Sequence, residues 1–344
     1  MSFMMKEILD QPHALLRCYK AEHKHAIELK RFAERQDFRL ILLVARGTSD
    51  NAALFGRYLL ELTTGKPVSL CAPSIHTLYH AKLDLRKALV IGISQSGEGT
   101  DINTVIAAAR RQGAFTIGIT NEAKSTMAGI VDDAFFVRAG TQRSVAATKT
   151  YTGQLLMLYM LATALGSHIK LEHVGEIPRW AESSLKIIPE IRQIVERYRF
   201  MRQCVVVARG LNYANAFELS LKLMETCYIV AERFSAADFL HGPIAMVESD
   251  FPMILFMPPG KTYADMRKLA DRVRKLRAET LVISGEGVRL PGHMTSIRVP
   301  AAIPEVYTPI PYIVPGQLFA CLLAELKGID PDKPRSLKIV TRTL

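Results

Sequence analysis

Several kinds of segment are scarce or missing in this sequence, and each absence removes a class of protein. The most apolar run, residues 155–166, is too short for the about 20 residues that a membrane helix needs, so we expect a buried helix there and no membrane partner. The five cysteines lie far apart and form no CxxC pair, which favours reduced thiols and a cytoplasmic location. The first residues, MSFMMKEILDQPHALL, carry charge early and lack a cleavage pattern, so we predict no signal peptide.

Runs of like charge are also missing, although the net charge is +11. The basic residues are scattered over predicted helix faces, as in KLADRVRKLRAE, and no five of them are consecutive. A nucleic-acid-binding protein usually gathers such charge into a patch. We therefore expect no nucleic-acid partner, and a basic balance suits a small anionic substrate equally well.

The common catalytic and cofactor motifs are absent too. The sequence contains no GxSxG nucleophile elbow, no GxxxxGK[ST] phosphate loop and no GxGxxG dinucleotide fingerprint. None of the nine histidines shows zinc-ligand spacing with a cysteine or carboxylate partner. We predict neither a metal nor a cofactor.

What the chain does contain is an internal repeat. ILLVARGTSDNAALFGRYLLE, at residues 41–61, resembles VVVARGLNYANAFELSLKLME, at residues 205–225. LVIGISQSGEGTDINTVIAAARRQGAFTIGIT pairs in the same way with MILFMPPGKTYADMRKLADRVRKLRAETLVIS, where Ser94 aligns with Pro258. Each copy reads as an apolar strand, a polar turn and a helix, so two homologous halves are predicted.

Continuous apolar strands that alternate with helices indicate an α/β fold, with a parallel sheet covered by helices on both faces. Ligands in such folds bind outside the carboxyl ends of the strands. The expected organisation is a helical lead at 1–35, a first domain at 36–167, a helical linker at 168–195, a second domain at 196–330 and a tail at 331–344.

Residues 94–99, SQSGEG, follow an apolar strand and precede a helical pattern. Backbone N–H groups of such a loop, together with the helix N-terminus, form an anion site to which Ser94, Ser96 and Thr100 add hydroxyls and Gln95 adds an amide. A simple helix cap is the alternative. The hydroxyl-rich end of the first strand, GTSD, lies beside this loop in such a sheet, which favours a polar pocket. The second half has MPPGK instead, so one site per chain is expected.

The second half contributes candidates for acid–base chemistry. Lys222 and Glu225 stand three residues apart and share one helix face among apolar neighbours, where burial would raise the proton affinity of a glutamate and suit it to act as a general base. An ordinary salt bridge is the alternative. His241 precedes Gly-Pro and is therefore expected at a turn, and a structural role is its alternative.

As a set these segments resemble the double sugar-isomerase (SIS) domain family. The resemblance rests on ARGTSDNAALFGRYLLE, SQSGEGTDI, AGTQRSVAATKTYT, AERFSAADFLHGP and KGIDPDKPRSLKIVT, in that order along nearly the whole chain. The chain is similar to the isomerase half of the glutamine–fructose-6-phosphate aminotransferases, which are the glucosamine-6-phosphate synthases. It is equally similar to the SIS-type glucosamine-6-phosphate deaminases. The resemblance implies two tandem SIS domains, each a flavodoxin-like three-layer sandwich with a parallel sheet.

The resemblance also implies roles for residues in the first half. Ser94, Gln95 and Ser96 match the sugar-phosphate loop. A threonine of the family is replaced by Gly99, and Thr100 stands one residue further on. Ser49 and the backbone at Val145 are implied to border the sugar.

In the second half the resemblance makes Glu225 the residue that moves a proton between C1 and C2, with Lys222 lining the site. His241 matches a ring-opening histidine that reaches across from the partner subunit, so a homodimer is implied. The family's tail lysine position holds Ile339 here, and Lys338 precedes it.

A hexose-phosphate enzyme is the function that the resemblance implies. The SIS region starts within some 40 residues of the start, which leaves no room for a glutaminase domain, so we expect deamination of glucosamine 6-phosphate to fructose 6-phosphate and ammonia. The open alternatives are another aldose–ketose isomerisation, deglycation of a ketosamine phosphate, deamination of a galactosamine phosphate, and a non-catalytic sugar-phosphate sensor. A sensor would not need Glu225 and His241.

Overall fold

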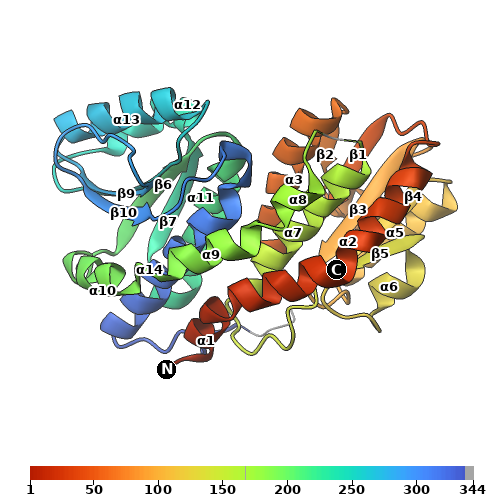
Figure 1. Cartoon of the computed structure of the whole chain (residues 1–344), viewed down its shortest axis with the longest axis horizontal. Coiled ribbons are helices and arrows are strands. Elements are labelled where there is room, and N and C mark those ends of the chain that lie inside the picture. The colour runs from red at the N-terminus through yellow and green to blue at the C-terminus, as the bar shows by residue number, and fades with distance from the viewer. Residues whose placement is uncertain (167, 338–344) are drawn as a thin grey trace. The chain divides into compact units, whose positions relative to one another are not determined.

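The computed structural model describes residues 1–166 and 168–337, and it contains two parallel five-stranded sheets (Figure 1). The first unit consists of His13–Gln142 and Lys149–Glu176. The second unit consists of Met1–Pro12, Arg143–Thr148 and Ile177–Leu337. The second unit therefore includes the start of the chain and the helices that follow residue 176.

The first unit carries the sheet β2-β1-β3-β4-β5. Its elements are α2 (Gln11–Ala33), β1 (Leu40–Val44), α3 (Thr48–Thr64), β2 (Val68–Leu70), α4 (Ser74–Thr77), β3 (Ala88–Ser94), α5 (Thr100–Arg111), β4 (Phe115–Thr120), α6 (Thr126–Ile130), β5 (Asp133–Phe136), α7 (Lys149–Ala164) and α8 (Leu171–Val174).

Both faces of this sheet are covered, as the apolar strands predict. On one face α5 and α6 pack Ile106 and Met127 against Val44 and Val90. On the other face lie α3 and α7, which contact β1 and β4 respectively. β3 is buried along its whole length, because neither face is open to water.

The second unit carries the sheet β10-β9-β8-β6-β7. Its elements are α1 (Phe3–Leu9), α9 (Ile177–Leu185), α10 (Ile188–Arg197), β6 (Gln203–Ala208), η1 (Gly210–Asn212), α11 (Tyr213–Cys227), β7 (Val230–Ser235), α12 (Ala236–Leu240), η2 (Pro243–Met246), β8 (Pro252–Met257), α13 (Tyr263–Lys275), β9 (Glu279–Gly285), β10 (Thr295–Val299), η3 (Glu305–Tyr307) and α14 (Pro309–Leu326).

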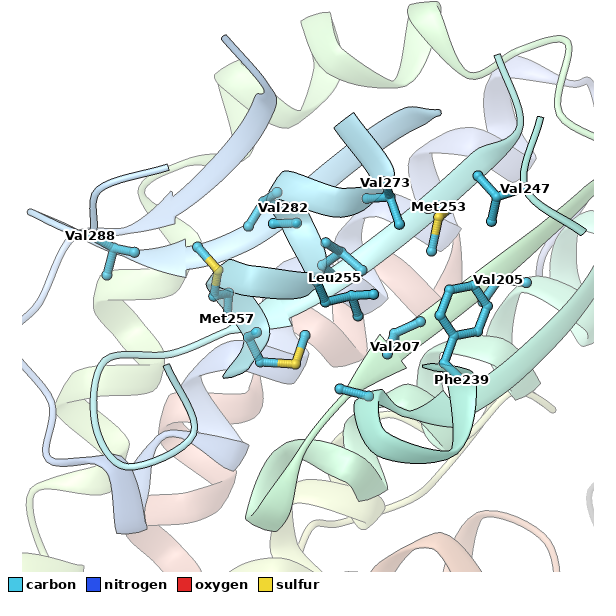
Figure 2. Close-up of a cluster of buried hydrophobic side chains, with 14 residues drawn as sticks. Val205, Val207, Phe239, Val247, Met253, Leu255, Met257, Val273, Val282 and Val288 are labelled. Carbon is cyan, nitrogen blue, oxygen red and sulfur yellow. The ribbon is translucent and has the colours of Figure 1, made fainter. Parts of the chain in front are cut away.

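The core under α12 and α13 is shown in Figure 2. Phe239 of α12 and Val273 of α13 point toward Val207 of β6 and Leu255 of β8. Four apolar residues of α13 recur at i, i+3, i+4 and i+7 and are buried, which is the pattern of a helix with one face on a sheet: Met266, Leu269, Ala270 and Val273. The opposite face is covered by α11, which contacts β6 and β7, and by α14, which contacts β9 and β10.

The two sheets have the same strand order when each is read from its second strand: 2-1-3-4-5. This confirms the α/β class and the two homologous halves predicted from the sequence. It also places the ends of the first and third strands of each half side by side, since Val44 pairs with Gly92 and Val207 with Leu255. That edge of a doubly wound sheet is where ligands bind.

The same ion pair recurs in both halves at this edge. Arg46, which follows β1, donates from Nε to Oδ2 of Asp101 in the first turn of α5, at 2.7 Å. Arg209, which follows β6, stands 3.2 Å from Oδ2 of Asp265 in the first turn of α13. The arginine of the repeated VARG motif thus fixes the helix that follows the third strand.

In the part of the chain that the structure describes, one helix, α14, is long and apolar enough to cross a membrane by length and composition alone. Its most apolar window is 89% buried inside the protein, however. A helix that is apolar on all sides is expected in the centre of a large core, and α14 packs against α9, α10 and α11 there.

A charged cluster joins α2 to β5 in the first unit. His25 Nε2 lies 2.8 Å from Oδ1 of Asp133, and its Nδ1 lies 3.4 Å from Oε2 of Glu22. Arg138 pairs with the other oxygen of Glu22 at 2.7 Å. The hydrogen bond to Asp133, followed by that to Glu22, raises the pKa of His25 to about 9, against the opposing effect of burial.

We expect this cluster to make stability depend on pH. Because the folded-state pKa of His25 lies above its unfolded value, the stabilisation is complete below about pH 6.5 and is lost as pH rises through about 9. In His25→Gln the fall in unfolding free energy over that window should be smaller by about 1–2 kcal/mol, a figure reduced for the partial exposure of the ring. Urea unfolding at a series of pH values measures it, with His23→Gln on the same helix as control. Parallel pH profiles for His25→Gln and the native chain would contradict it.

Candidate functional site

The loop at 94–99 begins where β3 ends, as predicted. Two backbone N–H groups of the loop donate to serine hydroxyls of the same loop. Ser94 Oγ accepts the N–H of Gly97 at 3.1 Å, and Ser96 Oγ accepts the N–H of Glu98 at 3.3 Å. Gly97 has φ +67°, and a Cβ at this position would collide with the side chain of Ser125. The tight turn therefore requires glycine here.

The carbonyl groups of this loop are turned toward the protein. The oxygen of Gln95 accepts the N–H of Asn121 at 3.1 Å, and that of Gly97 accepts Asn103 Nδ2 and the N–H of Met127, both at 3.0 Å. The N–H groups of Gly99 and Thr100 have no acceptor within the described ranges. The loop thus presents donors rather than acceptors at the start of α5, which is the arrangement that favours an anion.

The two remaining first-unit candidates lie at the starts of the helices that follow β1 and β3. Thr100 is the first residue of α5 and is exposed. Ser49 lies in the first turn of α3, is 6% exposed and accepts Gln154 Nε2 at 2.9 Å. The negative charge of Asp101, which would oppose a bound phosphate, is paired with Arg46.

In the second unit α11 carries a row of three charged side chains. Lys222 Nζ lies 2.7 Å from Oε2 of Glu225 and 3.4 Å from Oε1 of Glu218. Lys222 and Glu218 are 0% exposed, whereas Glu225 is 19% exposed. Burial alone would lower the pKa of Lys222, but the charges of Glu218 and Glu225 outweigh it and leave that pKa raised.

This row confirms that Lys222 and Glu225 share a helix face, and it adds a residue that the sequence reading missed. Glu218 stands four residues before Lys222, so the i, i+4 spacing was the available signal. The lysine is held as an ammonium between one enclosed carboxylate and one that reaches solvent. Glu225 is the member of the row that a substrate could touch.

His241 and Val145 also belong to the second unit. His241 is exposed and caps α12, with its N–H donated to the carbonyl of Asp238 at 3.1 Å, which confirms the predicted turn. No hydrogen bond or ion pair joins its ring to Glu225 in the described part of the chain. Val145 is half-buried in the loop 143–148. Lys338 and Ile339 lie outside the described residues.

In the equivalent loop of the second half, residues 258–262, a side chain of the same protein accepts the backbone N–H groups. The carboxylate of Glu305 accepts the N–H of Lys261 at 2.5 Å, the N–H of Thr262 at 3.2 Å and the hydroxyl of Thr262 at 2.8 Å. Gly260, at φ +128°, leaves no Cβ where this carboxylate lies. The donors at the start of α13 are thus taken by a side chain of the same protein, and a cavity of about 350 Å³ borders the loop.

A metal centre has no candidate in the residues that the structure describes. Within 1–166 and 168–337, no group of three or more His, Cys, Asp or Glu side chains is placed to hold an ion.

Comparison with known proteins gives the class of this fold and site. The SIS domain family matches residues 37–164 and 200–290, and the chain belongs to this family. It is related to the isomerase domain of glucosamine-6-phosphate synthase.

Named relatives are glutamine–fructose-6-phosphate aminotransferases. That of Pyrococcus horikoshii is 37% identical over 97% of this chain, and that of Aquifex aeolicus is 33% identical over 98%. The chain spans only 56% and 57% of the lengths of these two relatives.

Solved structures agree on the fold. The C-terminal domain of glucosamine-fructose-6-phosphate aminotransferase from Francisella tularensis has a TM-score of 0.88 at 26% identity, covering 97% of this chain and 98% of that one. Glucosamine-6-phosphate deaminase from Thermotoga maritima has a TM-score of 0.81 at 22% identity, covering 99% and 100%. At that identity the second likeness shows the fold alone.

We expect removal of the Glu305 carboxylate to open the second loop to anions. Glu305→Ala leaves the N–H groups of Lys261 and Thr262 without their acceptor, which should cost about 1–3 kcal/mol of unfolding free energy. Added inorganic phosphate should then raise the melting temperature of this variant more than that of the native chain. Thermal unfolding with and without phosphate measures both effects.

The control is Glu286→Ala, which removes an exposed carboxylate from the bordering cavity without touching the loop donors. An equal phosphate response in the native chain and in Glu305→Ala would contradict the assignment of Glu305 as the occupant of those donors.

Proposed function

We propose that the chain is a phosphosugar isomerase that deaminates glucosamine 6-phosphate to fructose 6-phosphate and ammonia. The observation that carries the proposal is the pair on α11, a solvent-reaching Glu225 carboxylate held 2.7 Å from a fully buried Lys222 ammonium. A carboxylate fixed in this way is suited to proton transfer between neighbouring carbons. The donor-lined loop 94–99 supplies the separate requirement, a place for the phosphate group.

The proposed reaction starts from the open-chain aldehyde, and His241 assists the ring opening that produces it. Glu225 removes the proton from C2 while O1 takes up a proton, which gives an enolamine. Glu225 then returns its proton to C1 while the nitrogen releases one. The product of this step is an imine at C2. Water adds to that carbon and ammonia leaves, so C2 becomes the ketone of fructose 6-phosphate.

Each side chain then has one task. Ser94, Gln95, Ser96 and Thr100 bind the phosphate, and fixing the phosphate holds the sugar in one orientation during proton transfer. Lys222 orients the Glu225 carboxylate. Ser49 and the backbone of Val145 contact the sugar, and we keep Lys338 as a candidate from the tail.

The setting of the enzyme is part of the proposal. The five cysteines are all free thiols, and four of them are buried, which suits the cytoplasm. We propose a homodimer in which His241, exposed at the end of α12, acts in the site of the partner subunit.

Replacing the proposed base tests the chemistry directly. Glu225→Gln keeps the shape of the side chain but removes its ability to take a proton, so turnover should fall by about 10²–10⁴-fold. Binding of fructose 6-phosphate, measured by calorimetry, should persist. The assay follows fructose 6-phosphate and ammonium together from glucosamine 6-phosphate, with the exposed Glu232→Gln as control. Native-like turnover in Glu225→Gln would contradict the role of Glu225 as the base. Isomerisation without release of ammonium would indicate another aldose–ketose reaction.

Replacing a loop hydroxyl tests the phosphate site. Ser96→Ala removes one donor and the acceptor of the Glu98 N–H, so the Kd for inorganic phosphate should rise about 5–10-fold, as expected for loss of one hydrogen bond to a charged group. Isothermal calorimetry with phosphate measures it. Ser249→Ala, on an exposed turn of the second unit, is the control. An unchanged Kd in Ser96→Ala would remove this hydroxyl from the site.

A further inference from the structure

Glu7, near the end of α1, is 5% exposed and lies against the loop 143–148. Its Oε1 accepts the N–H of Arg143 at 2.6 Å and the N–H of Ser144 at 3.4 Å. A buried carboxylate that accepts two successive backbone N–H groups fixes both peptide planes, and such charge-assisted bonds are stronger than neutral ones. The first residues of the loop are therefore set by a side chain 136 positions earlier in the chain.

The far end of the same loop is held from the same part of the chain. Gln11 donates from Nε2 to Oε1 of Gln317 at 2.8 Å, and Gln317 donates to the carbonyl of Thr148 at 3.5 Å. Both glutamines are 0% exposed. Two polar residues four positions apart, Glu7 and Gln11, thus act on the two ends of the loop.

Between these two ends the loop has unused donors. Within residues 1–166 and 168–337, the N–H groups of Val145, Ala146 and Ala147 have no protein acceptor. Ala146 is 0% exposed, so the cost of leaving its N–H unpaired is substantial unless water or a ligand accepts it. The loop is fixed at both ends and has open backbone N–H groups in its middle. Such a segment is suited to bind a molecule that offers several oxygen acceptors.

We propose that Glu7 is a positioning residue for the sugar: it holds the loop 143–148 in the conformation in which the backbone N–H groups at 145–147 meet hydroxyl oxygens of a hexose phosphate. This inference rests on the proposed function, and it adds to that function a residue that does not contact the substrate itself. Glu7 acts on the sugar portion alone, because the phosphate belongs to the loop at 94–99.

The test separates the two parts of the ligand. Glu7→Gln preserves the size of the side chain but replaces the charged acceptor. We expect the Kd for fructose 6-phosphate to rise about tenfold, while the Kd for inorganic phosphate stays within about twofold of the native value. In the assay that follows fructose 6-phosphate and ammonium from glucosamine 6-phosphate, KM should rise similarly and kcat should change by less than about threefold.

The matched control is Glu22→Gln, because Glu22 is a carboxylate of similar burial, 3% exposed, that pairs with Arg138 and His25 in the first unit. It should leave both Kd values unchanged even if it lowers the melting temperature. Should Glu7→Gln not fold, Glu7→Asp keeps the charge but shortens the reach, and the same selective loss of fructose 6-phosphate affinity is expected.

Two results would overturn the inference. One is a folded Glu7 variant that binds fructose 6-phosphate as the native chain does. The other is an equal weakening for fructose 6-phosphate and inorganic phosphate, which would indicate a general structural loss. Because binding is measured without turnover, a native chain that binds fructose 6-phosphate but does not deaminate leaves the role of Glu7 intact. A native chain that binds no hexose phosphate removes both proposals, and this is seen before any variant is made.

Discussion

The arrangement of the second unit depends on a lysine ammonium that is removed from water. Burying one such charge costs several kcal/mol unless opposite charges and hydrogen bonds replace the solvent. Glu218 and Glu225 provide them to Lys222 from the same helix, at one turn before and one turn after. The consequence reaches beyond stability, because the shorter of these two contacts, at 2.7 Å, also holds the Glu225 carboxylate. The same ion pair that makes the burial tolerable therefore fixes the direction of the side chain that can meet a substrate.

The helix that carries this row is itself held on several sides. α11 packs against β6, β7 and α14, so its register cannot slip without exposing apolar surface. The end of α11 is marked by Tyr228 at φ +54°, whose hydroxyl accepts the N–H of Arg335 and whose ring lies under the Arg335 guanidinium. A rigid helix is a better support for a reacting group than a loop, since small displacements of that group reduce the rate of proton transfer.

Sequence reasoning was accurate wherever the information was local. Apolar runs predicted strands such as β3, and the change to polar residues at Ser94 predicted the loop. The spacing of three residues between Lys222 and Glu225 predicted that they share a helix face. The repeat predicted two homologous halves, and the strand order that they share agrees with this prediction. What it missed are contacts between distant positions: Glu7 reaches residues 143 and 144, and Glu305 reaches Lys261. Nothing in the residues around a glutamate tells which remote backbone N–H it will accept, because that depends on how whole elements pack.

These two carboxylates and a third, Asp332, share one physical role. Glu305, Glu7 and Asp332 each accept two backbone N–H groups that would otherwise attract an anion or water: those of Lys261 and Thr262, of Arg143 and Ser144, and of Phe3 and Met4. In a chain with a net charge of +11, such clusters of donors would otherwise compete for anions.

The start of α5 is treated differently. There the nearby carboxylates are engaged elsewhere, Asp101 with Arg46 and Glu98 with the N–H and hydroxyl of Thr126. The two halves have the same strand order and the same arginine–aspartate pair, yet only the second fills its loop with a carboxylate of its own. Divergence after duplication therefore needed little change in the fold. A single acidic side chain, placed by the connection between β10 and α14, takes the donors at the start of α13, whereas, among the described residues, the start of α5 keeps N–H groups open, as the proposed phosphate site requires.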